Sequence, residues 1–540
     1  MRLAIRGGMA LLMLTALAAC ARSPQGSTPR AHGGGAVLLR GLGLDPGSLD
    51  AQKARSVEAQ RVLMDICEGL TTLDRRGRVA PGIAKTWTVG PGGRTYTFHL
   101  RHDARWSTGQ PVVAQDFVAG LRRLVDPHTG SDYAEVVNVI VHARGIIAGR
   151  RPIESLGVLA PDPHTVVIRL RTLAPYLPAL MAHPATCPVD PPLLAKYGSG
   201  YAQPGHLPSD GAFVLSQWVR GSYIYLRRNR YYWRNSATRL EGVKYLISVD
   251  ENAELNLYRA GEVDIIDVIP RSEFGWIKRN LGAQLHIAPL LATYYYGFNL
   301  RRAPFKGRPG LRRALAMVIN RRRLTRLVLR TGERPAYGWV PPGFAGYAPQ
   351  SPAWRRLTLP QRIAEARRLY RQAGYSAARP LRFTLKYNTG EIHTELAIAV
   401  ASMWRRALGV RVRLIAEDFS SLMRDIYRGN VEMFRSSWSA DYDDPYTFAQ
   451  YFESDFGINL PHYDNPKYDA LVNRAEAQRD PAKRIALLEK AERLMLRDQP
   501  VIPLYFYVSK HLVKPQVTGW YDNEMDVTYS RYLGLRGESP

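Results

Sequence analysis

The sequence predicts an α/β protein of two or more lobes, in which helices flank mixed β-sheets. Three observations lead to this prediction. The chain has 540 residues, which is more than one hydrophobic core ordinarily accommodates. Its composition, 46% hydrophobic and 22% charged, is that of a folded protein and not of a disordered one. Strand-like and helix-like periodicities mix along the whole chain, and no short repeat is visible.

The expected elements follow from local patterns. Stretches rich in β-branched and aromatic residues predict strands at 95–100, 165–170, 223–227, 243–249, 293–299, 381–387 and 410–415. Apolar residues three and four positions apart predict amphipathic helices at 359–373, 393–408 and 481–497. Gly374 follows the first of these helices as a helix-stopping residue. Proline-rich segments at 184–192 and 335–352 predict turns or loops between lobes.

The N-terminus predicts export. Residues 1–6 carry two arginines, and residues 9–19 form an unbroken run of apolar and small side chains. This run is shorter than the ~20 apolar residues that span a bilayer, so residues 1–19 are read as a signal peptide. Its end, Leu-Ala-Ala before Cys20, resembles the lipobox of bacterial lipoproteins, whose cysteine carries the lipid. Residues 20–35 are then the lipid anchor and a flexible tether. The alternative is a plain cleaved signal with an incidental cysteine.

The formal charge of +27 raises the question of a nucleic-acid partner. The basic residues, however, are spread along the chain in groups such as Arg75-Arg76, Arg122-Arg123 and Arg321-Arg322-Arg323. An evenly basic coat is typical of a solvated surface, so we expect no nucleic-acid partner. Such a coat should still favour anionic surfaces such as lipid headgroups.

Neither metal nor catalytic motifs occur in the sequence. Cys67 and Cys187 remain besides Cys20; they could form one disulfide in an oxidising compartment or be small buried residues. Their spacing is not that of a metal site. The sequence also lacks a His-Glu-x-x-His motif, a Gly-x-Ser-x-Gly elbow and a phosphate-binding Gly-Lys-Ser/Thr loop. We therefore expect no metal, no cofactor and no enzyme activity such as that of a secreted peptidase.

Several short strings carry a family resemblance. They are Tyr-Thr-Phe-His-Leu-Arg at 96–101, Ala-Arg-Trp-Ser at 104–107, Thr-Tyr-Tyr-Tyr at 293–296, Arg-Ala-Pro-Phe at 302–305 and Trp-Ser-Ala-Asp-Tyr at 438–442. In this order and spacing, from about residue 48 to the C-terminus, the chain resembles the bacterial family 5 extracellular solute-binding proteins of oligopeptide-binding type.

The resemblance implies a two-lobed periplasmic-binding-protein (Venus-flytrap) fold, of class II type with an extra domain. Lobe I would combine residues 36–67, 192–291 and 509–540; lobe II, the extra domain, would be 68–191; lobe III would be 292–508. The chain would cross between lobes near Cys67 and near Cys187, which makes a disulfide between them geometrically conceivable.

The resemblance also implies a role. A monomer in the periplasm or at the cell surface, held on a bacterial membrane by the Cys20 lipid, would bind short peptides between closing lobes. It would deliver them to the membrane permease subunits of an ABC importer. The alternative ligand is a specialised one: a murein tripeptide, haem or a metal chelate.

The resemblance also assigns binding roles to residues at matching positions of this chain. Residues 431–438 have strand character, and the segment around Ser437, Trp438 and Ser439 would pair with the ligand main chain. Asp441 matches the aspartate that receives the peptide α-ammonium. Arg435 and His393 match residues that receive the ligand carboxylate, which suits the paired donors of arginine.

Other positions match or depart from the family. Three tyrosines match aromatic positions that face the cleft: Tyr133, Tyr295 and Tyr507. A family disulfide would join positions that hold Ala292 and Ser439 here, so it cannot form. A cleft lysine falls on Leu329, beside Arg330, and a cleft glutamate falls near Arg55. The charge reversal at Arg55 predicts tolerance of acidic peptide side chains and a weaker preference for Lys-rich peptides.

Overall fold

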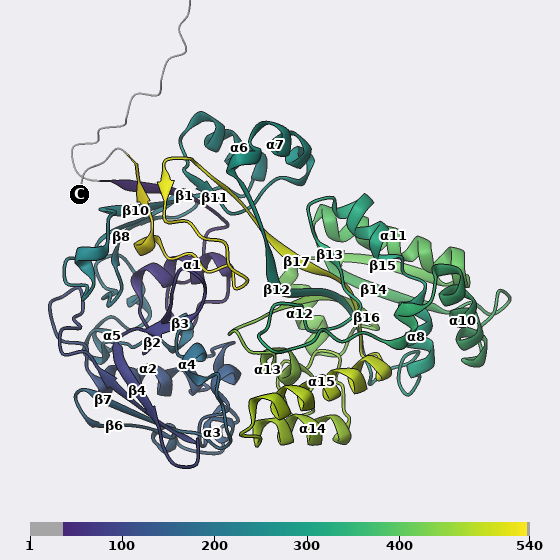
Figure 1. The fold of residues 1–540 in the computed structure, drawn as a ribbon, viewed down its shortest axis with the longest axis horizontal. Helices are drawn as coiled ribbons and strands as arrows, with labels where there is room; N and C mark the ends of the chain where they lie inside the picture. The colour runs from purple at the N-terminus through teal and green to yellow at the C-terminus, as the bar shows by residue number, and fades with distance from the viewer. Residues whose placement is uncertain (1–35, 537–540) are drawn as a thin grey trace, which may run out of the picture.

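The computed structural model describes residues 36–536. The predicted signal peptide at 1–19, Cys20 and the tether to residue 35 lie outside the described residues. None of the helices within residues 36–536 is long and apolar enough to cross a membrane. Figure 1 shows two halves of the molecule, joined near the centre by long strands.

One large sheet runs through both halves. Its neighbouring strands are, in order, β15 (Arg411–Glu417), β14 (Arg382–Asn388), β16 (Met433–Ser439), β12 (Leu285–Phe298), β17 (Val501–Val513), β11 (Ile265–Ile266), β1 (Val37–Gly43), β10 (Gly242–Ile247), β9 (Tyr223–Arg228) and β8 (Phe213–Val219). A short strand, β13 (Arg334–Pro335), also pairs with β17. Separate hydrophobic clusters cover the two ends of this sheet.

Strands β12 and β17 connect the halves (Figure 1). They pair twice: residues 285–289 of β12 lie opposite 508–512, and residues 293–297 lie opposite 501–506. The register shifts between Pro289 and Thr293, where the pairing is interrupted. The sequence prediction for β12, 293–299, was too short at its start. Pro289 obscured the earlier part, because proline within a strand-like run argues against a strand.

A second sheet forms in the N-terminal third of the chain. It is antiparallel, with the order β4 (Ala84–Val89), β5 (Thr95–Leu100), β7 (Thr165–Arg169) and β6 (Val158–Asp162). Alternate residues Tyr96, Phe98 and Leu100 of β5 are buried. Helix α2 (Ala114–Val125) packs against β6 and β7. This alternation is the period-2 pattern that identifies a sheet with one face in the core.

The cysteines are joined. Cys67 follows α1 (Val57–Ile66) and forms a disulfide with Cys187, with the two Cα atoms 6.3 Å apart. The bond closes a loop of 120 positions, and all four strands of the second sheet lie within this loop.

The three helices predicted from apolar spacing are present. They are α10 (Leu359–Gln372), α11 (Glu391–Leu408) and α15 (Pro481–Asp498). Thr358 caps α10 by accepting from the backbone N–H of Gln361. Helix α11 begins two residues earlier than expected, which places His393 in its first turn.

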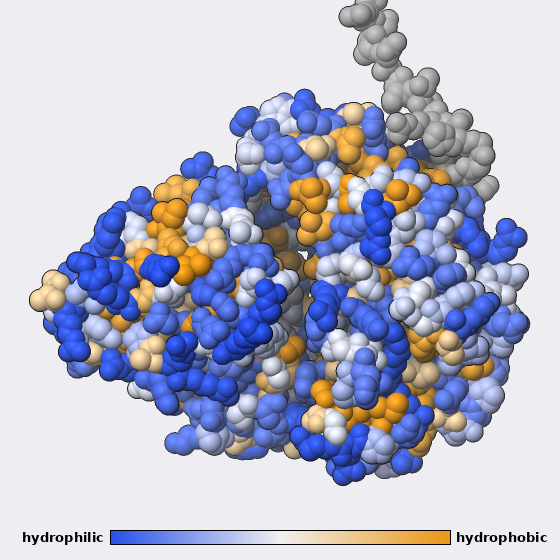
Figure 2. Space-filling model, turned by 180° about the vertical axis from the view of Figure 1, so that it is seen from behind, coloured by the Kyte–Doolittle hydropathy of each residue, from blue (hydrophilic) through white to orange (hydrophobic). Residues whose placement is uncertain are grey.

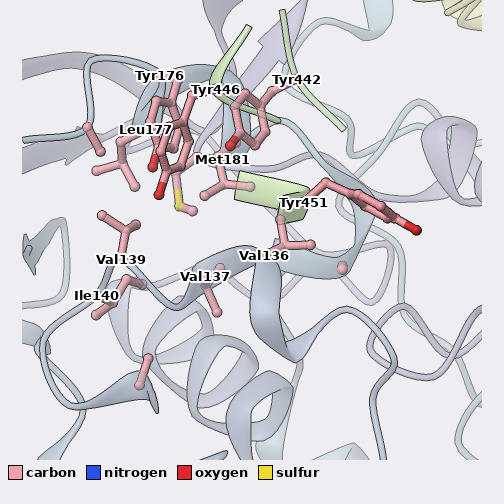
Figure 3. Packing of buried hydrophobic residues seen from close by; sticks show 14 of the residues in the cluster. Val136, Val137, Val139, Ile140, Tyr176, Leu177, Met181, Tyr442, Tyr446 and Tyr451 are labelled. Atoms are coloured by element: carbon pink, nitrogen blue, oxygen red, sulfur yellow. The ribbon is translucent and has the colours of Figure 1, made fainter. Parts of the chain in front are cut away.

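A continuous apolar cluster links the N-terminal third to residues 442–496. Figure 3 shows valines and Ile140 from the segment 136–140 beside Tyr176 and Leu177, with Tyr442 and Tyr446 close by. The ring of Tyr176 stacks on Tyr442 and on Tyr446, at centroid distances of 4.6 and 5.1 Å. Seen from behind, the surface still has a deep hollow between the halves (Figure 2).

Candidate functional site

Strand β16 has one unpaired edge. It pairs with β12 along its whole length, from Met433 to Ser439. On its other side, β14 pairs only with Met433 and Phe434. Within residues 36–536, no strand pairs with that edge from Arg435 to Ser439. Main-chain donors and acceptors on a strand edge can bind an additional extended chain.

Asp441 lies just beyond the end of β16, and the residue is half-buried. Burial raises the pKa of Asp441 to about 7, and a hydrogen bond from the Thr447 hydroxyl, at 3.3 Å, acts in the opposite direction. Within residues 36–536, no lysine or arginine forms an ion pair with this carboxylate. A buried carboxylate without a cation is costly, so the site would gain from a positively charged ligand group.

Tyr133 faces Asp441 from the other half of the molecule. Burial, and after it the charge of Asp441, raises the pKa of Tyr133 to about 12. The Tyr133 hydroxyl accepts a hydrogen bond from Gln60 Nε2 at 2.6 Å, and its ring lies 4.9 Å from that of His183. The structure therefore brings Tyr133 and Asp441 together, although more than 300 positions separate them.

Trp438 fixes the end of β16 next to Asp441. Its indole N–H donates to the carbonyl of Thr447 at 2.9 Å, and its ring lies 4.8 Å from that of Tyr451. Ser437 is partly buried and Ser439 is exposed. Both belong to the unpaired edge.

A guanidinium site lies at the other end of this edge. Arg435 is buried; its guanidinium donates to Asn388 Oδ1 at 2.9 Å and to the Tyr507 hydroxyl at 3.1 Å. It also lies 4.6 Å from the ring centre of Tyr294. Within residues 36–536, no carboxylate neutralises it. The site can therefore accept an anion through paired donors.

His393 belongs to the same group. Its Nδ1 lies 3.1 Å from the Tyr294 hydroxyl, so Tyr294 connects His393 to Arg435. Burial, and after it the Arg435 charge, lowers the pKa of His393 to about 3. The imidazole is thus neutral and can donate a hydrogen bond without adding charge.

The remaining predicted residues lie elsewhere. Tyr295 is fully buried; its ring packs 5.1 Å from Trp339 and its hydroxyl meets that of Tyr451. It therefore sits in the core, on the opposite face of β12 from Tyr294. Arg55 is exposed and forms an ion pair with Asp132 at 2.9 Å, which offsets its charge.

The positions of the absent family disulfide are neighbours. Ala292 and Ser439 are register partners across β12 and β16. Neither can form a disulfide, so this site lacks a covalent link.

Three contributing residues were missed by the sequence prediction: Tyr294, Asn388 and Thr447. Tyr294 stands in a run of three tyrosines, all buried, so alternation alone could not tell which of them meets Arg435. Asn388 ends β14, and only the parallel pairing of β14 with β16 brings it to Arg435. No metal site accompanies these residues: within residues 36–536, no group of three or more His, Cys, Asp or Glu side chains could hold an ion.

Comparisons with known proteins place this architecture. The model of the bacterial extracellular solute-binding proteins, family 5, matches residues 78–460. The periplasmic oligopeptide-binding protein OppA of Escherichia coli K12 is 36% identical over 531 residues, covering 98% of this chain and 97% of that protein.

Solved structures of related proteins have a similar fold. That of the E. coli murein tripeptide-binding protein MppA has a TM-score of 0.86 and 35% identity, covering 93% of this chain and 98% of that chain. That of Haemophilus influenzae OppA in complex with the peptide RPPGFSPFR has a TM-score of 0.84 and 32% identity, covering 93% and 99%. The fold is thus the mixed α/β periplasmic-binding-protein fold, and the chain belongs to the family 5 bacterial extracellular solute-binding proteins, a family of binding proteins and not of enzymes.

Proposed function

We propose that the chain binds short peptides between its two halves and presents them to an ABC importer. The observation that carries this proposal is the unpaired edge of β16. At one end of this edge lies the Asp441 carboxylate, which has no cationic partner among residues 36–536, and at the other lies the Arg435 guanidinium, which has no anionic partner there. A peptide offers the matching features: a main chain, an α-ammonium and an α-carboxylate.

The main chain of the peptide pairs with the edge at Ser437, Trp438 and Ser439. Such pairing reads no side chain, so it serves many sequences equally. Asp441 receives the α-ammonium, whose charge compensates the carboxylate. Arg435 receives the α-carboxylate, and His393 serves peptides of other lengths. Tyr133 and Tyr507 provide aromatic walls, while Tyr295 supports β12 from the core.

The spacing of the charged residues indicates peptide length. Arg435 and Asp441 are six positions apart, which is roughly 20 Å along an extended strand at about 3.3 Å per residue. Strand β16 ends at Ser439 and the chain bends at Asp441, so this length is an upper bound. It therefore suits peptides of about three to five residues.

Closure links binding to delivery. We infer the lobes to be 36–67 with 192–291 and 509–540, then 68–191, then 292–508. The pairing interruption between Pro289 and Thr293 supports the boundary near 291. Contacts such as the Arg271–Glu395 ion pair at 2.8 Å and the Tyr176–Tyr442 stack then hold the shut form. A ligand that touches both sides shifts the equilibrium towards this form.

The proposed cellular location rests on the sequence of residues 1–35. The proposal is an exported lipoprotein, anchored by Cys20 and working in the periplasm or at the cell surface. The periplasmic relatives support this placement. Mass spectrometry of the mature N-terminus tests it: a diacylated Cys20 is expected, whereas an unmodified mature start would contradict the lipid anchor.

A specialised ligand is the second candidate. The similarity to the murein tripeptide-binding protein favours it, because a tripeptide suits the same two charged ends. Mass spectrometry of the ligand that copurifies with the protein distinguishes the two. Mixed peptides indicate a general receptor; a single species indicates a specialised one.

Calorimetry with capped peptides tests the proposal. Trialanine should bind, and both N-acetyl-trialanine and trialanine amide should bind at least about tenfold more weakly, because each loses one charge-assisted contact. Equal affinities for all three would contradict a site that reads both peptide termini.

A further inference from the structure

A pocket lies beside β13, lined by other residues than those of the β16 edge. It is an open depression of about 730 Å³, lined by the exposed residues Arg322, Arg326, Arg330 and Gly332 and by Glu333. None of its lining residues belongs to the groups around Asp441 or Arg435. Pockets of this volume are of the size that holds small molecules or lipid headgroups.

The charge of this pocket is unbalanced. Within residues 36–536, no carboxylate forms an ion pair with Arg322, Arg326 or Arg330. Glu333, the acidic residue in the wall, is already paired with Lys510 at 2.5 Å and accepts from the Thr331 hydroxyl at 2.7 Å. Three exposed arginines therefore line the depression without a carboxylate partner, although Arg330 Nε donates to the carbonyl of Leu327 at 2.9 Å.

The backbone gathers these arginines. They stand four positions apart along α9 (Arg321–Arg323), the π-helix Leu324–Leu329 and the residue after it, and all three line the pocket. Like charges at this spacing repel one another. Arg330 has a φ of 63° and Gly332 a φ of 106°, so two left-handed residues follow the π-helix.

The arginine triplet at 321–323 has three different environments. Arg321 is fully buried and donates to the carbonyl of Pro503 at 2.7 Å, so its role is structural. Arg322 lines the pocket, whereas Arg323 does not. Core packing explains the presence of Arg321, but it does not explain the positive charge of Arg322 in the pocket.

We propose that this pocket binds a phosphate-bearing anion. Three guanidinium groups and no unpaired carboxylate in the pocket favour a multiply charged oxyanion over a single carboxylate. The phosphate can belong to a soluble ester or to a phospholipid headgroup. The residues that line this pocket are distinct from those proposed to hold the peptide termini.

Two measurements distinguish these sources. One is calorimetry with inorganic pyrophosphate and with glycerol 3-phosphate. The other is co-flotation with phosphatidylcholine vesicles, with and without phosphatidylglycerol. The test variant is Arg322→Gln/Arg326→Gln. The control is Arg323→Gln/Arg356→Gln, which removes the same charge from exposed arginines outside the pocket.

The pocket variant should lose binding by roughly tenfold or more, whereas the control should stay within about twofold. Loss confined to the soluble anions identifies a free phosphate ester, and loss confined to phosphatidylglycerol vesicles identifies a headgroup. Three results would overturn the proposal: no saturable binding in either measurement, equal losses in both variants, or a parallel loss of trialanine affinity in the pocket variant. The last would make the pocket part of the peptide site.

Discussion

The Tyr176 and Tyr442 rings stack almost parallel, with centroids 4.6 Å apart and planes 6° from parallel. Tyr176 comes from the N-terminal third, and Tyr442 directly follows the carboxylate proposed to hold the peptide amine. The stack therefore couples the position of Asp441 to the contact between the halves.

Removing this stack should weaken closure. Tyr176→Ala should lower peptide affinity several-fold and leave a larger open population, because aromatic pairs contribute about 0.5–1.5 kcal/mol beyond their burial. The Tyr176→Phe variant keeps the ring and serves as the control. Small-angle X-ray scattering with and without trialanine measures the change. Equal compaction by ligand in both variants would show that the stack has no part in closure.

Substitution of Asp441 should stabilise the empty protein while removing the amine site. Burial raises the pKa of Asp441 to about 7 from 3.8, so the empty folded chain retains a proton that the unfolded chain releases. Stability therefore falls as pH rises from about 4 to 7. At pH 8, Asp441→Asn should gain on the order of 2 kcal/mol in denaturant unfolding, after discounting for partial exposure. A destabilised variant would contradict this.

Peptide affinity should depend on pH through the same carboxylate. Binding of an α-ammonium requires ionised Asp441, so affinity should fall below pH 7, by roughly tenfold per unit once the carboxyl is protonated. Asp441→Asn should bind trialanine weakly at every pH. Calorimetry between pH 5 and 8 tests this; a flat profile for the unmodified protein would show that the peptide does not contact Asp441.

The disulfide should contribute to stability. Cys67→Ser/Cys187→Ser removes a link that closes a long loop, and the expected loss is up to about 5 kcal/mol in unfolding free energy. Reduction of the unmodified protein is the parallel measurement. Unchanged unfolding midpoints in both experiments would show that the packed interface alone holds the segment in place.

The charge near Arg55 should influence side-chain preference. Arg55→Glu should shift preference from Asp- towards Lys-containing tripeptides, although the Arg55–Asp132 ion pair reduces the effect in the unmodified protein. Asp132→Asn, which frees Arg55, should move preference the other way. Calorimetry with both peptides checks the pair of variants; identical preferences throughout would discard the role of Arg55.

Local patterns predicted the long amphipathic helices well. Helices α10, α11 and α15 each begin and end within two residues of their expected bounds, because apolar spacing and caps are local signals. The start of β12 was missed, since residues 285–289 become a strand through pairing with distant β17. Tertiary pairing of this kind leaves no local pattern.

The binding site, too, could be predicted from the sequence only in part. Asp441 and Arg435 could be proposed by family resemblance at their own positions. The contact of Tyr133 with the Asp441 region, and the link from Tyr294 to His393, arise from packing between segments far apart in sequence. Tyr295 was proposed because it matches an aromatic position of the family, and the local sequence does not reveal which face of β12 meets Arg435.

A crystal structure of the protein with trialanine tests the central claim most directly. The account predicts an extended peptide whose main chain hydrogen-bonds to the free edge between Arg435 and Ser439, with its amine about 3 Å from the Asp441 carboxylate. A peptide bound elsewhere, or an amine distant from Asp441, would contradict it.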